Sequence, residues 1–272
     1  MTNGSLDVRD ASAWDDIQRC EPRGDVSHAT VFTNEIQKLD DSVTWQRNEM
    51  TIQLHDHIAI LKQGAQAWNA WRMSHLEERP DLTGADLSGM SLEFVDLHET
   101  NLAGANFEGT DLRSANLRKC CLEGTNFKMA DLIEANLEES SVIGANLKGA
   151  DLYKTNFRRA NLSRAYLVQA IIRRANFSEA NLSEVDGTKA DLLQSNLMRA
   201  SLTHANFSQA ILKGTNLIEA DLTSANLQDA NLNKANLCRA QLLSANLEHA
   251  SLYEALLHGT LMPDGTVYEV PL

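Results

Sequence analysis

Chemistry in this chain would have to come from its histidines, cysteines and carboxylates, and their spacing argues against a catalytic or metal site. His55 and His57 are two residues apart, so on a helix their side chains point in different directions. Asp111, Asp131 and Asp151 recur every twenty residues, a spacing that could gather acids for general acid/base catalysis. The same spacing follows from a repeat that runs through the chain, and it implies no pocket. We therefore expect no enzyme, no catalytic residue, no metal site and no cofactor.

That repeat places a leucine or a similar residue at every fifth position. Between Leu82 and Leu257, 36 positions end in 2 or 7; 35 of them hold Leu, Phe, Ile or Val, and Gly187 is the exception. On a helix these residues would scatter around the cylinder, and in a flat strand they would alternate between faces. If the chain instead turns a corner in each repeat, all of them can face one interior. The sequence therefore predicts an all-β solenoid.

The outward positions predict how many repeats make one coil. Residues taken in steps of twenty alternate in charge without exception: Glu99, Lys119, Glu139, Arg159, Glu179, Arg199, Glu219 and Arg239. The same step stacks Phe107 on Phe127 and Phe157 on Phe177, and it aligns asparagines from Asn116 to Asn236. We therefore expect four repeats per coil, about nine coils and a rod about 40 Å long, at about 4.8 Å per coil.

The tandem A(D/N)LXX units resemble the pentapeptide-repeat family from residue 81 to about residue 260. The resemblance implies a right-handed quadrilateral β-helix. The segments KQGAQAWNAWR from Lys62 and LMPDGTVYE from Leu261 are similar to segments that border the repeats in many cyanobacterial members, which implies a cyanobacterial source. Some members of the family mimic DNA and bind type II topoisomerases, so the resemblance also raises that function.

The segments outside the repeats differ from them in pattern. Before the repeats, apolar residues at spacings of three and four predict one helical stripe: Ile58, Leu61, Ala65, Trp68 and Trp71. A solenoid end exposes its apolar interior and unpaired strand edges, so Trp68 and Trp71 are predicted to cover the first coil. We expect four segments: a polar, flexible segment 1–48, an α-helical cap 49–79, the β-helix 80–260, and a C-terminal cap 261–272.

Two local features are expected to depart from the regular repeat. Val185, like Met90 and Val95, is larger than the small residues that usually occupy its repeat position, and it is expected to fill part of the space that Gly187 leaves. In one outward column, glycines supply the positive φ that the second central residue of a type II turn requires. Where that column changes to Arg164 and Glu184, a different turn type is expected.

Composition favours a cytoplasmic protein that neither enters a membrane nor carries a secretion signal. The net charge is −13. No apolar run is long enough to span a bilayer, and the first residues lack the basic start and apolar centre of a signal peptide. The four cysteines have no metal-site spacing, and we expect free thiols in a reducing compartment.

Charge distinguishes the two functions that the sequence leaves open. A DNA mimic needs dense acidity of one sign, because a duplex carries one negative charge per about 1.7 Å of its axis. Residues 81–260 hold 22 acidic and 16 basic side chains, and their longest charged column alternates in sign. This pattern favours a non-catalytic scaffold or regulator that presents flat faces to a protein partner, with a DNA-mimicking topoisomerase binder as the alternative. Basic clusters bordered by glutamates disfavour direct binding of nucleic acid.

One outward column predicts where the partner binds. Beside the charged column, the side chains turn apolar at Met198, Ile218 and Cys238, and Leu193 lies around the neighbouring corner. A contiguous apolar patch with a polar rim is typical of protein interfaces. Three apolar residues in one column can also arise by chance in a long repeat. These four residues are the partner-binding candidates, and a homodimer is one form that the partner could take.

Overall fold

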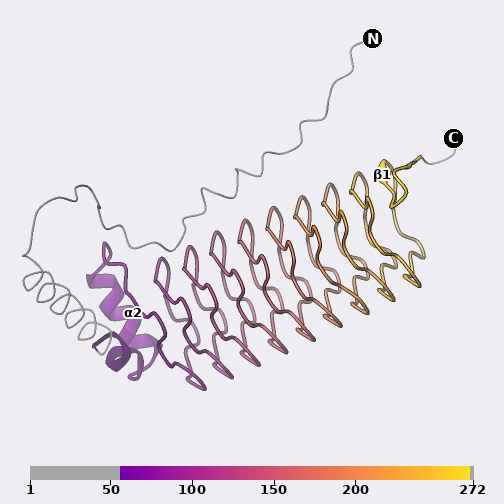
Figure 1. Cartoon of the computed structure of the whole chain (residues 1–272). Coiled ribbons are helices and arrows are strands. Elements are labelled where there is room, and N and C mark those ends of the chain that lie inside the picture. The colour runs from indigo at the N-terminus through magenta and orange to yellow at the C-terminus, as the bar shows by residue number, and fades with distance from the viewer. Residues whose placement is uncertain (1–55, 270–272) are drawn as a thin grey trace, which may run out of the picture.

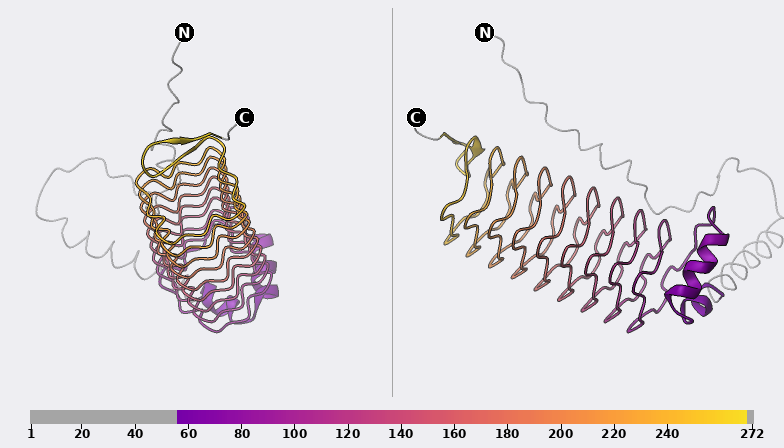
Figure 2. Two further views of the ribbon diagram at one scale, coloured as in Figure 1. Left: turned by 90° about the vertical axis from the view of Figure 1, so that its right-hand side faces the viewer. Right: turned by 180° about the vertical axis from the view of Figure 1, so that it is seen from behind.

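Stacked coils form a rod in a computed structural model that describes residues 56–269, with helix α2 at the N-terminal end of the stack (Figure 1). Parallel β-bridges join residues twenty apart, from Asp81–Asn101 to Gln241–Leu261. The predicted step of four repeats per coil is therefore confirmed. Viewed along the rod, successive coils lie over one another, which produces flat faces (Figure 2).

Each pentapeptide folds by the same local hydrogen bonds. In a typical unit, the Ala225 N–H donates to the carbonyl oxygen of Leu222 at 3.0 Å, and Ser224 between them has a φ of 58°. Arg164 and Glu184 adopt the same conformation, with φ of 60° and 58°. The expected change of turn type is therefore wrong. A non-glycine residue tolerates this left-handed conformation at a cost of about 1–2 kcal/mol, which the surrounding hydrogen bonds and core packing offset.

The leucine series forms one continuous apolar interior. Its members from Leu82 to Leu242 are at most 1% exposed, apart from Gly187, which has no side chain to bury. Two aromatic stacks lie within this interior. The ring centroids are 5.2 Å apart for Phe107 on Phe127 and 4.8 Å apart for Phe157 on Phe177. Both stacks were predicted from the twenty-residue step, and both are confirmed.

The gap at Gly187 is filled from the next coil. A Cβ atom built on Gly187 would lie 2.3 Å from Cε1 and 2.5 Å from Cδ1 of Phe207. The Phe207 ring therefore occupies the space that a leucine takes in other coils. Val185 is also buried, at 1% exposure, but the three atoms nearest to the missing side chain all belong to Phe207.

The helical segment lies against the first coil. Residues 56–61 are helical, and Gly64, with a φ of 102°, precedes helix α2, Ala65–Ser74. Trp68 is fully buried, and its Nε1–H donates to the carbonyl oxygen of Asp96 at 2.7 Å. The predicted stripe is thus turned toward the coil, and Leu61 is also fully buried. Segment 1–48, together with the start of the predicted helix, falls outside the described residues.

The last coil ends in a short antiparallel pair. Strands β1, Thr260–Leu261, and β2, Val267–Tyr268, pair with Thr260 opposite Tyr268. Met262 packs against the core, but Val267 is 52% exposed. Within the predicted cap 261–272, Val267 therefore does not close the last coil. The end of the predicted cap, residues 270–272, falls outside the described residues.

Candidate interaction face

One face of the rod carries three parallel columns of side chains, and we call it the ladder face. The asparagine column runs from Asn116 to Asn236, and the charged ladder runs from Glu99 to Arg239. Between them lies the middle column: His98, Arg118, Glu138, Arg158, Ser178, Met198, Ile218 and Cys238. Neighbours in each column are one coil apart, because the bridges join residues twenty apart.

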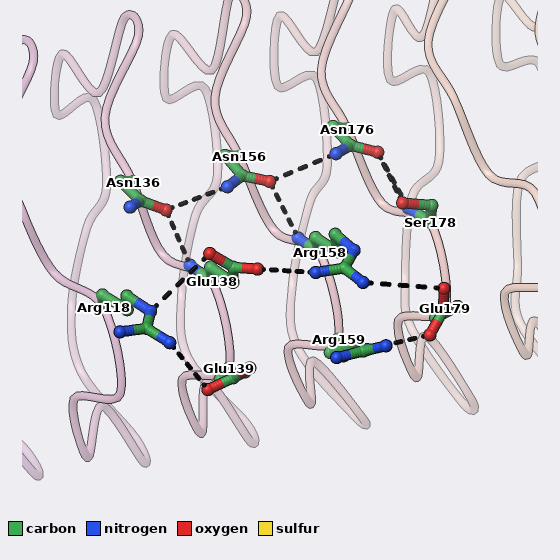
Figure 3. Close-up of polar contacts among 10 residues, drawn as sticks. All are labelled: Arg118, Asn136, Glu138, Glu139, Asn156, Arg158, Arg159, Asn176, Ser178 and Glu179. Atoms are coloured by element: carbon green, nitrogen blue, oxygen red, sulfur yellow. Dashed lines mark hydrogen bonds and ion pairs between the residues drawn. The ribbon is translucent and has the colours of Figure 1, made fainter.

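The asparagine column fixes the backbone beneath the face. The Oδ1 atom of Asn156 accepts the Arg158 backbone N–H at 3.1 Å, and it also accepts Nδ2–H of Asn176 at 3.3 Å (Figure 3). The Asn156 amide in turn donates to Asn136 at 3.0 Å. Each such amide satisfies its own turn and the coil next to it. This double use explains why the repeat favours Asn at the position before leucine.

Ion pairs that cross between coils neutralise one half of the ladder face (Figure 3). Arg158 Nη1 lies 2.9 Å from Glu138 Oε1, and Arg159 Nε lies 2.8 Å from Glu179 Oε2. Arg118 Nε lies 3.6 Å from Glu138 Oε2, and Arg158 Nη2 lies 4.0 Å from Glu179 Oε1. The alternation predicted from the sequence thus becomes a network of opposite charges.

Hydrogen bonds and charges within this network shift the pKa values of its members. The hydrogen bond from Arg159, reinforced by the charges of Arg159 and Arg158, lowers the pKa of Glu179 below its ordinary value of 4.5, although partial burial opposes this. The pKa of Arg159 is raised for the reciprocal reason. These side chains are charged at neutral pH, and their charges offset one another. This half of the face therefore lacks the one-signed potential of a nucleic acid or of its mimic.

The other half of the middle column is apolar. Met198, Ile218 and Cys238, which we call the apolar strip, are stacked and half-buried. The Ile218 carbonyl oxygen accepts the backbone N–H of Arg199 at 2.9 Å, so its peptide is held between coils. The exposed parts of the three side chains face outward, between the asparagine column and the charged ladder. The structure therefore brings together three of the four partner-binding candidates.

Leu193, the fourth candidate, lies on the preceding face, which carries two exposed isoleucines that were not predicted from the sequence. Ile171 and Ile211 are 42% and 40% exposed. Residues eighteen apart touch diagonally on this face, as the 2.7 Å distance between Arg173 Nε and Asp191 Oδ2 shows. Leu193 and Ile211 have the same separation, so they are diagonal neighbours. The signal was an isoleucine at the repeat position that usually holds Asp or Asn.

Leu256 is a further apolar residue that the sequence analysis missed. It is 56% exposed and pairs with Asn236 by a parallel bridge, so it ends the asparagine column. It also lies eighteen residues after Cys238, in the diagonal relation just described. The apolar strip therefore borders another apolar side chain toward the C-terminal end of the rod.

The groups suited to chemistry are spread over the structure or occupied in structural contacts. Burial raises the pKa of Cys120 to about 12, so this thiol stays protonated at neutral pH. Cys238 is a free thiol, whereas Cys121 is disulfide-bonded, so the expectation of free thiols is wrong for Cys121. His57 is buried and packs edge-on against Trp71, with ring centroids 4.8 Å apart.

Trp71 is half-buried beside the fully buried Trp68, and their ring centroids are 4.9 Å apart. Both rings thus belong to the contact between the helical segment and the first coil. His55, two residues before His57 in the sequence, lies outside the described residues. Within residues 56–269, no group of three His, Cys, Asp or Glu side chains could hold a metal ion. In the same part of the chain, no helix is both long and apolar enough to cross a bilayer.

Comparison with known protein families finds a match described as pentapeptide repeats (8 copies). It covers residues 91–128, 130–167, 160–203, 188–217, 200–237 and 220–259. These stretches make up more than half of the chain and include the whole apolar strip. A comparison with curated proteins gives no match.

Among solved structures, the chain is similar to HetL, a pentapeptide repeat protein involved in heterocyst differentiation regulation in the cyanobacterium Nostoc sp. strain PCC 7120. The identity is 33%, the match covers 73% of this chain and 98% of HetL, and the TM-score is 0.35. It is also similar to the pentapeptide repeat protein Rfr23 of the cyanobacterium Cyanothece 51142. Here the identity is 31%, with 47% of this chain and 91% of Rfr23 covered, and the TM-score is 0.32.

Proposed function

Because this chain belongs to the pentapeptide-repeat family, we propose that it is a non-catalytic scaffold or regulator that presents a flat face of its β-helix to a protein partner. Family membership implies a right-handed quadrilateral β-helix. We propose further that thirty-six repeats, at four per coil, make about nine coils, at the spacing of hydrogen-bonded strands. In this proposal segment 49–79 caps the first coil and segment 261–272 caps the last, and Trp68 and Trp71 seal the apolar interior.

The observation that carries the proposal is the contrast between the two halves of the ladder face. In one half, Arg158 Nη1 forms an ion pair with Glu138 Oε1 at 2.9 Å, and the neighbouring charged side chains also form ion pairs. In the other half, Met198, Ile218 and Cys238 replace those charges at equivalent positions. Apolar side chains rimmed by amides and ion pairs match the anatomy of a protein interface, in which apolar contact supplies affinity and the rim supplies orientation.

A DNA-mimicking topoisomerase binder is the weaker candidate. Such a mimic needs acidic side chains that remain unneutralised along a face. On the ladder face, the glutamates lie against arginines one coil away, as Glu219 does with Arg199 at 2.8 Å. Elsewhere, Glu108 is paired with Lys128 at 2.7 Å. These pairs support the scaffold over the mimic, and they equally disfavour direct binding of nucleic acid.

The compartment stays a prediction. We propose the cytoplasm as the compartment, and the two relatives described above come from cyanobacteria. Membrane binding is not part of the proposal.

Affinity capture from a cyanobacterial extract, followed by mass spectrometry, tests this function. The bait is the full chain, compared with Ile218→Glu and with a matched control, Val168→Glu. Val168 occupies the same position in its pentapeptide as Ile218 and is also half-buried, but it lies two faces away. We expect Ile218→Glu to lose a specific partner that Val168→Glu retains, with both variants folded. Equal capture by both variants would exclude the apolar strip, and topoisomerase subunits among the specific partners would favour the mimic.

A further inference from the structure

The charged ladder runs alongside the apolar strip, and its charges alternate in sign there as well. Arg199 and Glu219 lie beside Met198 and Ile218, and their Nε–Oε2 distance is 2.8 Å. Arg239 Nη1 lies 3.6 Å from Glu219 Oε1. The strip is therefore bordered by a row of evenly spaced charges whose signs alternate from coil to coil.

An alternating row is complementary to itself when one copy is turned end over end. Consider a twofold axis that lies in the plane of the ladder face and runs across the rod. Rotation about it reverses the order of the coils but keeps each column opposite the same column of the second copy. An axis through a coil would place like charges together, such as Glu219 against Glu219. An axis midway between two coils places ladder charges that face each other in pairs of opposite sign, so the alternation favours such registers; only a charge that faces Gly259 at the end of the column is left without an opposite.

One midway register also joins the apolar residues. With the axis between the coils of Met198 and Ile218, Met198 faces Ile218 of the second copy, and Ile218 faces Met198. In the ladder, Arg199 then faces Glu219, and Glu179 faces Arg239. Moving the axis one coil toward the C-terminus would set Arg199 opposite Gly259 and lose these contacts. At each end of the overlap in the chosen register, Arg158 of one copy faces His258 of the other.

We propose that the partner covering the apolar strip is a second copy of this chain, docked antiparallel about this axis. The inference deepens the proposed function, because it assigns an occupant to the same face. Each ladder arginine can keep its contact within the chain and still donate to the second copy, since a guanidinium carries five N–H donors. The apolar contact is isologous, with Met198 and Ile218 each contributing twice.

The expected dimer is modest in size and sensitive to salt. About six coils overlap, which at about 4.8 Å per coil gives a contact about 29 Å long. Its apolar contact is limited to Met198 and Ile218 from each copy, so we expect a weak or transient dimer. Its ladder charges are exposed, so salt screens them and the affinity falls as salt rises.

A charge-exchange experiment tests the register. Arg199→Glu alone sets two glutamates against each other across the axis, and Glu219→Arg alone sets two arginines against each other. We expect each variant to self-associate about tenfold more weakly than the unaltered chain, measured by sedimentation velocity at low salt. An equal mixture of the two restores opposite charges at both contacts. Dimerisation in the mixture should therefore return to within about threefold of the unaltered chain.

The mixture separates an interface effect from a folding effect. A merely misfolded variant would not be rescued by the other, and thermal unfolding of each variant alone checks its fold. Two single variants that fail to recover on mixing would overturn the register. An unaltered chain that stays monomeric at all concentrations tested would overturn the dimer itself. A monomeric chain would not contradict the proposed function. In that case, the capture experiment should recover a different protein with the unaltered chain, and the Ile218→Glu variant should fail to capture it.

Discussion

Replacing Gly187 and Phe207 by leucine, singly and together, tests how the coils pack. Gly187 occupies an inward position, and a Cβ there would lie 2.3 Å from Cε1 of Phe207. Its φ lies outside the left-handed region, so the backbone itself would accept a side chain. Any loss of stability in Gly187→Leu must therefore come from the collision with the Phe207 ring.

The magnitude follows from packing on the two sides of the contact. Forcing a leucine into filled space costs about 1–3 kcal/mol. Phe207→Leu alone withdraws the ring from the gap and leaves a cavity; we expect a loss below the roughly 3–5 kcal/mol typical of Phe→Ala. The double variant restores leucine on leucine, as at Leu147 and Leu167 in the same column. We therefore expect the double variant to be more stable than the sum of the single losses predicts, by about 1 kcal/mol or more.

Urea unfolding of the four proteins measures this coupling. The midpoint and the slope of each transition give the free energy of unfolding, and an unchanged slope shows that the same surface is exposed in each case. A coupling energy near zero would refute the conclusion that Phe207 occupies the space of the missing side chain. Phe207→Leu that stabilises the chain would refute it as well.

Four other perturbations follow from the same structure. Leu152→Ala should cost about 2–5 kcal/mol in urea unfolding, because the side chain is fully buried; a loss below about 0.5 kcal/mol, the range of surface changes, would contradict its inward position. Arg159→Glu puts three acids in a row, so its loss of stability should shrink as salt is raised; a loss independent of salt would count against the ladder. Because the folded-state pKa of Glu179 lies below 4.5, its contribution is present above that pH and lost as the pH falls through the folded value; Arg159→Gln should reduce this acid sensitivity, measured as the urea midpoint against pH. Iodoacetamide should alkylate Cys238 in the folded protein far faster than Cys120, whose thiol is buried with its pKa raised to about 12; similar rates would contradict that burial.

Most of the coil was predictable because its interactions are local or repeat at a fixed step. The leucine positions, the stacked phenylalanines and the alternating charges depend only on the residues five and twenty positions away. The ion pair between Arg159 and Glu179, for example, joins residues twenty apart at 2.8 Å. A periodic pattern in such a chain therefore predicts contacts between coils, as well as which residues are buried.

The errors arose where one residue type can replace another without changing the backbone. Arg164 and Glu184 keep the left-handed turn that glycine makes elsewhere, since cooperative stacking holds them in it. The space beside Gly187 is taken by Phe207 from the next coil, a choice that depends on ring size, which the repeat pattern does not encode.

The candidate interface was predicted only in part, for a related reason. Met198 and Ile218 were found because the middle column was read in steps of twenty. Ile171 and Leu256 were missed because they replace Asp or Asn at the position before leucine, a column taken to be uniformly polar. Reading every outward column for departures from its usual residue type would have found them.

Protection of Cys238 measures most directly whether the apolar strip is an interface. Where the partner is another protein, the chain is alkylated with iodoacetamide in the presence and in the absence of the protein recovered by capture. Where the partner is a second copy, alkylation of the chain at low chain concentration is compared with alkylation at high chain concentration. A Val168→Cys variant places a reference thiol two faces away in the same molecule. When nine-tenths of the chain is bound, we expect alkylation of Cys238 to slow about tenfold while the reference thiol is unaffected. Equal rates at Cys238 in the bound and free protein would contradict an interface at the apolar strip.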